Sequence, residues 1–300
     1  MQNVSLIEEG IRTAVAIGKF DGVHLGHKKL LDEIVSYKDK GFKSLVFTFE
    51  RPFSDYFTGE RSRVLTPNDE KTGLFEAAGI DFLYMMPVNK EMVTYDPGAF
   101  VKEILVGKLK AGLIAAGSDL SFGDKGMGNI ALVRRIASEL KESAYSVSEI
   151  EKIKYRGEDI SSSLVRDAVL KGDMEKVRDM LGRSYSFEGE VTHGKKLGMT
   201  IGMPTANLIP ADDKLMPPYG VYVSDTILNG AVYRSITNIG MRPTVNDGDS
   251  VTAETHIIGF SREIYGEKLR VELKRFIRPE RRFDSLEALK EQMKRDITEA

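Results

Sequence analysis

Two of the four histidines of this 300-residue chain lie three positions apart in one glycine-rich segment. The segment, Gly18-Lys19-Phe20-Asp21-Gly22-Val23-His24-Leu25-Gly26-His27, follows the apolar run Thr13–Ile17 and precedes a stretch with helical spacing of apolar residues. This order predicts a strand, a turn and a helix, and the free N–H groups at a helix N-terminus attract anions. A spacing of three places both imidazoles on one face of the first helical turn. Protonated His24 and His27 could therefore stabilise a phosphoryl group.

Two alternatives to a phosphate site are a purely structural turn and a metal site. The chain has no cysteine, and the glycine-rich segment supplies no further carboxylate ligands for zinc. We therefore favour phosphate as the ligand of His24 and His27.

A second candidate site is Pro204-Thr205-Ala206-Asn207. Thr205 and Asn207 offer hard, uncharged oxygen ligands, which suit a magnesium ion already neutralised by ATP phosphates. An ordinary turn is the alternative. The nearby segment Gly189–Lys196 approaches a P-loop, but it lacks the final Ser or Thr and does not run into a helix. We reject a P-loop and keep Thr205 and Asn207 as candidate Mg²⁺ ligands.

Alternating strand and helix patterns must position the histidine segment. This alternation predicts an open α/β sheet with parallel strands, in which ligands bind beyond the carboxyl ends of the strands. The expected strands are Thr13–Ile17, Ser44–Phe49, Phe82–Met86 and Leu113–Ala116, and further helices are expected at Asp69–Ala78, Pro97–Val106 and Ala131–Lys141.

The pattern changes after Met180 to short segments rich in β-branched and aromatic residues. Such segments, separated by Gly, Pro, Asn and Asp, predict a small antiparallel β-barrel. Asp284 is the expected cap of a terminal helix whose apolar face would pack on the barrel. We divide the chain into domains 1–186 and 187–300. The expected strands are Tyr185–His193, Gly220–Ile227, Ala231–Ile239, Thr252–Ile258 and Leu269–Ile277, and the helix face is Leu286, Leu289, Met293 and Ile297.

Composition narrows the classes of function. Lys and Arg number 43 against 45 Asp and Glu, so the net charge of -2 gives no reason to expect a nucleic-acid partner. No apolar run approaches the roughly 20 residues that cross a bilayer, and no signal peptide is visible. Zero Cys excludes disulfides and thiolate metal sites. We expect a cytoplasmic protein without a membrane partner.

The string Gly-x-Phe-Asp-Gly-x-His-x-Gly-His resembles the signature of the HxGH nucleotidyltransferases, in the version found in prokaryotic bifunctional riboflavin kinase/FAD synthetases. Gly117–Gly123 and Ile160–Arg166 resemble two further motifs of that family. The resemblance implies a Rossmann-like N-terminal domain that transfers an adenylyl group from ATP to FMN and releases pyrophosphate.

The implied catalytic residues of this domain are His24, His27 and Arg166, and a guanidinium can grip phosphate bidentately. For the serines before Arg166, a simple helix N-cap is the alternative. The resemblance implies ATP contacts from Gly18, Phe20, Asp21, Gly26, Ser161, Ser162 and Ser163, and flavin contacts from Asp119 and Phe122.

The second half of the chain resembles the riboflavin kinases of the same family. His193–Asn207 matches their His-Gly to Pro-Thr-Ala-Asn segment, with Met199 and Met203 replacing its Arg and Phe. The resemblance implies a β-barrel kinase in which Glu254 takes the proton of the ribityl hydroxyl as that hydroxyl attacks the γ-phosphate of ATP. It also implies ATP contacts from Gly194 and Lys195, flavin contacts from His256 and Arg278, and Mg²⁺ at Thr205 and Asn207.

The resemblance extends from Ile17 to Ile297 and predicts an enzyme that makes FMN from riboflavin and then FAD from FMN, with ATP as co-substrate and Mg²⁺ in both steps. One departure is Glu50-Arg51-Pro52-Phe53, where the family shows Glu-Pro-His-Pro. A kinase with an inactive first domain is therefore one alternative. The other is a non-enzymatic flavin- or nucleotide-binding module.

Overall fold

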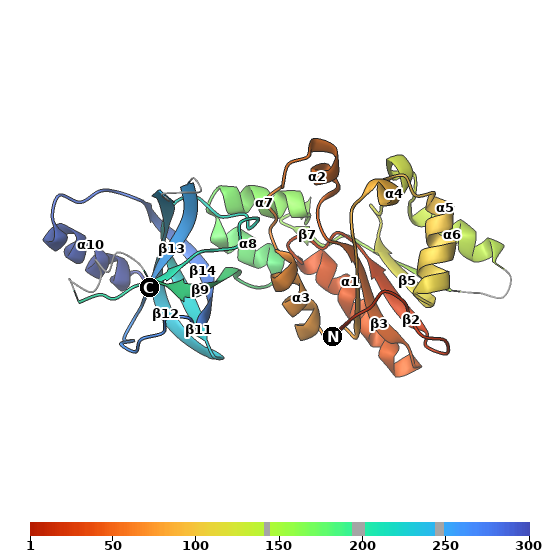
Figure 1. Cartoon of the computed structure of the whole chain (residues 1–300), viewed down its shortest axis with the longest axis horizontal. Helices are drawn as coiled ribbons and strands as arrows, with labels where there is room; N and C mark the ends of the chain where they lie inside the picture. Colours follow the sequence, from red (N-terminus) through yellow and green to blue (C-terminus); the bar gives the residue numbers. More distant parts are fainter. Residues whose placement is uncertain (141–144, 194–201, 244–248) are drawn as a thin grey trace. The chain divides into compact units, whose positions relative to one another are not determined.

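The chain forms two compact units, Met1–Ser161 and Ser162–Ala300, in a computed structural model (Figure 1). The structure describes residues 1–140, 145–193, 202–243 and 249–300. Within these ranges, no helix is long and apolar enough to span a bilayer.

The first unit contains a six-stranded sheet in the order β1-β4-β3-β2-β5-β6. Every neighbouring pair is parallel, as the alternation of strand and helix patterns predicted. The strands are β1 (Gln2–Asn3), β2 (Thr13–Ile17), β3 (Lys43–Phe49), β4 (Phe82–Met86), β5 (Ala111–Gly117) and β6 (Ser146–Ile150), and β7 (Lys154–Tyr155) pairs separately with β8 (Glu158–Asp159). The helices are α1 (Leu25–Ser36), η1 (Tyr37–Lys40), α2 (Phe53–Thr58), α3 (Asn68–Ala77), α4 (Lys90–Val93), α5 (Pro97–Ala99), the π-helix η2 (Phe100–Lys108), η3 (Asp124–Gly126) and α6 (Ile130–Glu139).

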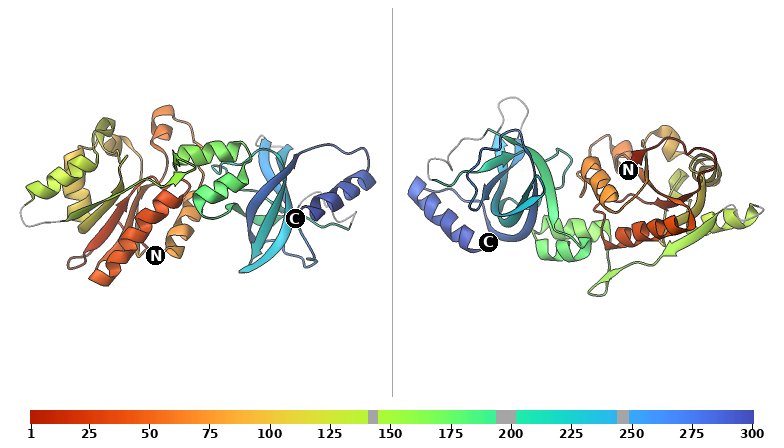
Figure 2. Two further views of the ribbon diagram at one scale, coloured as in Figure 1. Left: turned by 180° about the vertical axis from the view of Figure 1, so that it is seen from behind. Right: turned by 90° about the horizontal axis from the view of Figure 1, so that it is seen from below.

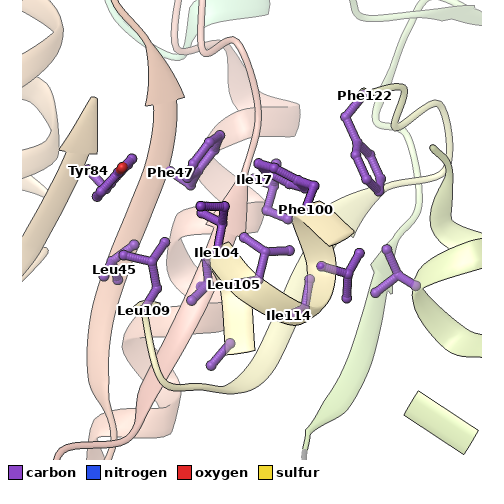
Figure 3. Packing of buried hydrophobic residues seen from close by; sticks show 14 of the residues in the cluster. Ile17, Leu45, Phe47, Tyr84, Phe100, Ile104, Leu105, Leu109, Ile114 and Phe122 are labelled. Carbon is purple, nitrogen blue, oxygen red and sulfur yellow. The ribbon is translucent and has the colours of Figure 1, made fainter. Parts of the chain in front are cut away.

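Both faces of this sheet are buried. Val15 and Ile17 point into a core formed with η2 and α6, which Figure 3 shows around Phe100. Ala14 and Ala16 point into the opposite core, formed with α1 and α3. Because successive side chains alternate between faces, strands buried on both sides read as continuous apolar runs. The loops at the ends of the strands are then the part of the sheet left open to ligands.

The strand order reverses at β2, which lies between β3 and β5. Its carboxyl end leads into Gly18–His27, and the carboxyl end of β5 leads into Gly117–Gly123. Both predicted motifs therefore begin at the same edge of the sheet, at its switch point. Open α/β sheets bind ligands at such a point.

The second unit is a closed antiparallel barrel in the order β10-β13-β12-β11-β14-β9, seen from two further directions in Figure 2. The barrel predicted from the short β-rich segments is confirmed. The strands are β9 (Tyr185–Thr192), β10 (Ala206–Leu208), β11 (Gly220–Leu228), β12 (Ala231–Pro243), β13 (Asp249–Ile257) and β14 (Lys268–Pro279), and the helices are α7 (Ser162–Leu170), α8 (Met174–Leu181) and α10 (Leu286–Thr298).

The terminal helix α10 differs from the expectation in two respects. Its cap is Ser285 rather than Asp284, because the Ser285 hydroxyl accepts the backbone N–H of Ala288 at 3.1 Å. Its predicted apolar face is incompletely buried, and Leu286 is 45% exposed. An ion pair ties the helix to the end of β14: Arg278 Nη2 lies 2.7 Å from Oδ2 of the buried Asp296.

The compact second unit begins before the predicted boundary, which falls inside β9. Helix α8 buries Met174, Val177, Met180 and Leu181 and packs on β9 and β14. The Tyr185 hydroxyl donates to the Leu215 carbonyl at 2.6 Å. Helix α8 and Tyr185 therefore belong to the core of the second unit.

We expect a fragment of residues 187–300 to unfold at a lower temperature than a fragment of residues 162–300. The shorter fragment loses α8 and Tyr185, and fully burying one large apolar side chain contributes roughly 1.5–3 kcal/mol. Thermal unfolding followed by circular dichroism measures the difference. Equal midpoints would show that α8 does not stabilise the barrel.

Candidate active sites

A strained turn joins β2 to α1. Phe20, Gly22 and Val23 have φ angles of 52°, 87° and 41°. The left-handed region costs a non-glycine residue about 1–2 kcal/mol, so two positions in this turn carry strain. Burial of the Phe20 and Val23 side chains offsets it. The turn delivers His24 to the N-cap position of α1.

The two histidines of the motif are stacked at the start of α1. Their ring centroids lie 3.8 Å apart at an interplanar angle of 17°. The backbone N–H of His27 donates to His24 Nδ1 at 3.4 Å, so the His24 proton is on Nε2 when the ring is neutral. Phe20 backs His27 at a centroid distance of 5.0 Å, and Phe75 of α3 meets Phe20 edge-on. This aromatic column connects the core to the helix N-terminus.

Phe20 has a structural role in this turn, and an ATP contact from Phe20 stays a prediction. Its side chain is 0% exposed and packs between the core and the His27 ring. Asp21 also holds the turn, because its Oδ1 accepts the backbone N–H groups of Leu65 at 2.7 Å and Thr66 at 3.2 Å. An ATP contact from Asp21 stays a prediction.

Close packing explains two glycines of the motif. A Cβ at Gly18 would lie 3.1 Å from the Phe20 ring, and a Cβ at Gly26 would lie 3.1 Å from the His24 ring. Side chains there would push against the aromatic column. The glycines thus keep the imidazoles in place, in addition to any contact with ATP.

The loop after β5 contains the two predicted flavin contacts of the first unit. Asp119 is exposed and pairs with Lys152, whose Nζ lies 3.2 Å from its Oδ2. Phe122 is 3% exposed and packs on Phe100 at a centroid distance of 5.1 Å (Figure 3). A flavin contact from Phe122 stays a prediction. It would require this buried ring to leave the core.

The departure at Arg51–Phe53 has a structural explanation. Phe53 begins α2, and its ring packs edge-on against Phe49 at a centroid distance of 4.7 Å. Arg51 is exposed. The substitution therefore places an additional aromatic side chain against the core of the first unit.

The serine and arginine motif spans the division between the two units. Ser161 ends the first unit, whereas Ser162, Ser163 and Arg166 lie on α7 of the second. Their contribution to the histidine site stays a prediction.

A polar row crosses the outer face of the barrel. Glu254 of β13 lies directly opposite Asn207 of β10 on one side and Asn238 of β12 on the other. Directly opposed residues have their side chains on the same face. Their strand neighbours Ala206, Leu208, Ala253 and Thr255 are buried inside the barrel, so the row faces outward.

Asn238 and Glu280 were missed by sequence reasoning. Asn238 Nδ2 donates to Glu280 Oε1 at 2.9 Å, and a Cβ at Gly240 would collide with the Glu280 carboxylate. The space left by Gly240 thus brings a second carboxylate close to the row. Asn238 lies in a string that resembles the family, but only the register of β12 places it opposite Glu254.

A cavity of about 280 Å³ adjoins this row. Its walls include Thr205, Asn207, Thr255, Arg262 and Tyr265. Within the described ranges, no group of three or more His, Cys, Asp or Glu forms a metal site. The neutral oxygens of Thr205 and Asn207 nevertheless fit Mg²⁺ that arrives with ATP, because the phosphates supply the negative charge.

Two of the remaining predicted residues of the second unit, His256 and Arg278, have structural partners. The His256 ring donates from Nδ1 to the Pro204 carbonyl at 2.9 Å, which holds the segment before Thr205. Arg278 is occupied by its ion pair with Asp296. Flavin contacts from His256 and Arg278 stay predictions, and Gly194 and Lys195 lie outside the described residues.

Comparisons with known proteins cover both units. A family model described as FAD synthetase matches residues 7–164, and one described as riboflavin kinase matches residues 181–300. The bifunctional riboflavin kinase/FMN adenylyltransferase of Listeria monocytogenes is 34% identical over 289 residues, covering 95% of this chain and 90% of the relative. Its counterpart from Bacillus subtilis is 33% identical over 299 residues, covering 98% and 93%.

A solved structure shares the fold of the whole chain. The crystal structure of a macrolide-efflux protein from Streptococcus pneumoniae has a TM-score of 0.86 and 26% sequence identity, covering 99% of this chain and 97% of that one. The family models and the full-length relatives agree on both halves. The chain therefore belongs to the family of bifunctional riboflavin kinases/FMN adenylyltransferases.

Proposed function

We propose that the second unit phosphorylates riboflavin to FMN and that the first unit adenylylates FMN to FAD, with ATP as co-substrate in both reactions. The observation that carries this assignment is that each unit has its own set of groups for phosphate chemistry. The first has the stacked His24 and His27 at a helix N-terminus, and the second has Glu254 beside the cavity with Thr205 and Asn207. We place the enzyme in the cytoplasm, where ATP is available.

In the adenylylation step, an oxygen of the FMN phosphate attacks the α-phosphorus of ATP and pyrophosphate leaves. Negative charge on the phosphoryl oxygens is stabilised by the imidazole N–H groups and the free backbone N–H groups at the start of α1. Gly18 and Gly26 let ATP approach this turn closely. Ser161, Ser162, Ser163 and Arg166 add further phosphate contacts in this proposal.

In the kinase step, Glu254 takes the proton of the terminal ribityl hydroxyl as its oxygen attacks the γ-phosphorus of ATP. Thr205 and Asn207 would hold Mg²⁺, which neutralises phosphate charge when it is bound. Asn207 is also the cross-strand neighbour of Glu254, so the base and the phosphate site share one patch of the barrel. The predicted ATP contacts Gly194 and Lys195 belong to this site.

One incubation tests the assignment. Purified protein is mixed with riboflavin, ATP and Mg²⁺, and the flavins are separated by chromatography. We expect FMN first and FAD later. FMN alone would support a kinase with an inactive first domain, and unchanged riboflavin would support a binding protein.

We expect His27→Ala to lower FAD formation from supplied FMN by about 10²–10³-fold, the usual cost of removing one preorganised donor. Riboflavin phosphorylation should stay at the wild-type rate, because it takes place in the other unit. Lys29→Ala, which alters an exposed residue two positions along α1, is the control. An equal loss of both activities in folded His27→Ala would contradict the two-site assignment.

We expect Glu254→Gln to lower riboflavin phosphorylation by ~10²–10⁴-fold, the usual contribution of a general base. Binding of riboflavin and adenylylation of supplied FMN should persist. The control is Glu188→Gln on β9, which breaks a surface ion pair between Lys268 Nζ and Glu188 Oε2. Near-normal phosphorylation by Glu254→Gln would rule out the base role.

A further inference from the structure

Five hydroxyl side chains form a continuous hydrogen-bonded chain inside the barrel. They are Ser224 and Thr226 of β11, Ser235 and Thr237 of β12, and Thr255 of β13, and none is more than 1% exposed. The Oγ–Oγ distances are 2.9 Å for Thr226–Ser235, 2.8 Å for Ser235–Ser224, 2.8 Å for Ser224–Thr237 and 2.9 Å for Thr237–Thr255. The chain thus connects three adjacent strands.

The protons of these hydroxyls can be assigned to one direction. The Ser235 hydroxyl donates its single proton to the Ser224 backbone carbonyl at 3.1 Å, so it accepts from both Thr226 and the Ser224 hydroxyl. The Ser224 hydroxyl then accepts from Thr237, and Thr237 accepts from Thr255. Every hydroxyl donates once. A fully satisfied buried network of this kind rigidifies its surroundings and specifies one arrangement.

The network fixes the register of the strands that carry the polar row. Thr237 lies directly opposite Thr255 on the inner face, and the next pair, Asn238 and Glu254, lies opposite on the outer face. A slip of one residue would turn the hydroxyls outward and Glu254 inward. Thr255 also lines the cavity that contains Asn207. The inner hydrogen bonds therefore hold the segment of β13 that contributes Glu254 to the polar row and Thr255 to the cavity.

We propose that Thr237 is a positioning residue for riboflavin phosphorylation, which it supports by holding Glu254 in place through its hydrogen bonds to Ser224 and Thr255. The inference rests on the proposed role of Glu254. Thr237 itself is enclosed in the barrel, where its side chain is 0% exposed. Its contribution is the rigid placement of β13 beside β12.

Thr226 provides a matched comparison at the other end of the network. It is equally buried, and its hydroxyl also bonds to a neighbouring hydroxyl, that of Ser235. Its cross-strand partners are Tyr233 and Val271, so it lies on β11 away from β13. A valine at either position has nearly the shape of threonine and removes one buried hydroxyl.

The test uses the full chain with Thr237→Val, Thr237→Ser and Thr226→Val. We expect Thr237→Val to lower kcat for riboflavin phosphorylation by about 10- to 100-fold, because a displacement of ~1 Å can cost that much. KM for ATP should change far less, and Thr237→Ser should restore kcat. Thr226→Val should lower the unfolding temperature while kcat stays near wild type. Adenylylation of supplied FMN should be unchanged in all three.

Hydrogen exchange gives a second readout. The backbone amides of β13 should exchange faster in Thr237→Val than in Thr226→Val. If Thr237→Val does not fold, Thr237→Ala removes the same hydroxyl at the same position, away from the residues that line the cavity, and gives the same comparison. Wild-type kcat in Thr237→Val, or equal losses of kcat in Thr237→Val and Thr226→Val, would overturn the inference. An inactive wild-type protein would instead overturn the proposed function on which the inference rests.

Discussion

The alternation of side chains between the two faces of a strand constrains where chemistry can occur in both units. In the first unit, Val15 and Ile17 fill one core while Ala14 and Ala16 fill the other, so the ends of the strands are left for ligands. In the barrel, the inner face is filled, and the polar side chains of the proposed kinase site lie on the outer face and at the cavity. In both units, the faces that the strands bury therefore determine where polar side chains remain accessible to a ligand.

In the proposed function, the two units stabilise phosphate charge in different ways. The first offers the N-terminus of α1 and two stacked imidazoles, which a turn with two left-handed non-glycine residues holds in place. The second offers the neutral oxygens of Thr205 and Asn207, which can bind a cation, and the Glu254 carboxylate, which can accept a proton. These sets match the chemistry: displacement at the α-phosphorus by an ionised phosphate needs charge stabilisation, whereas attack by a hydroxyl also needs a base.

Local patterns allowed much of the architecture to be predicted from the sequence. The parallel strands follow from apolar runs, and the proximity of His24 and His27 follows from a spacing of three at a helix start. Long-range pairing could not be predicted in the same way. The Asn207–Glu254–Asn238 row depends on the register of three strands, and the burial of Phe122 depends on its packing against Phe100. Likewise, the sequence showed the apolar stripe of α10 but not the Arg278–Asp296 ion pair that ties it to β14.

In the proposed function, two separate sites, one in each unit, act in succession through FMN. A mixture of the His27→Ala and Glu254→Gln proteins tests it most directly. Each protein is first given riboflavin, ATP and Mg²⁺ alone, and FAD is measured by chromatography. We expect very little FAD from either protein alone and substantial FAD from the mixture, because one variant supplies FMN and the other adenylylates it. A mixture that forms no more FAD than the separate proteins, while each keeps its remaining activity, would contradict the account.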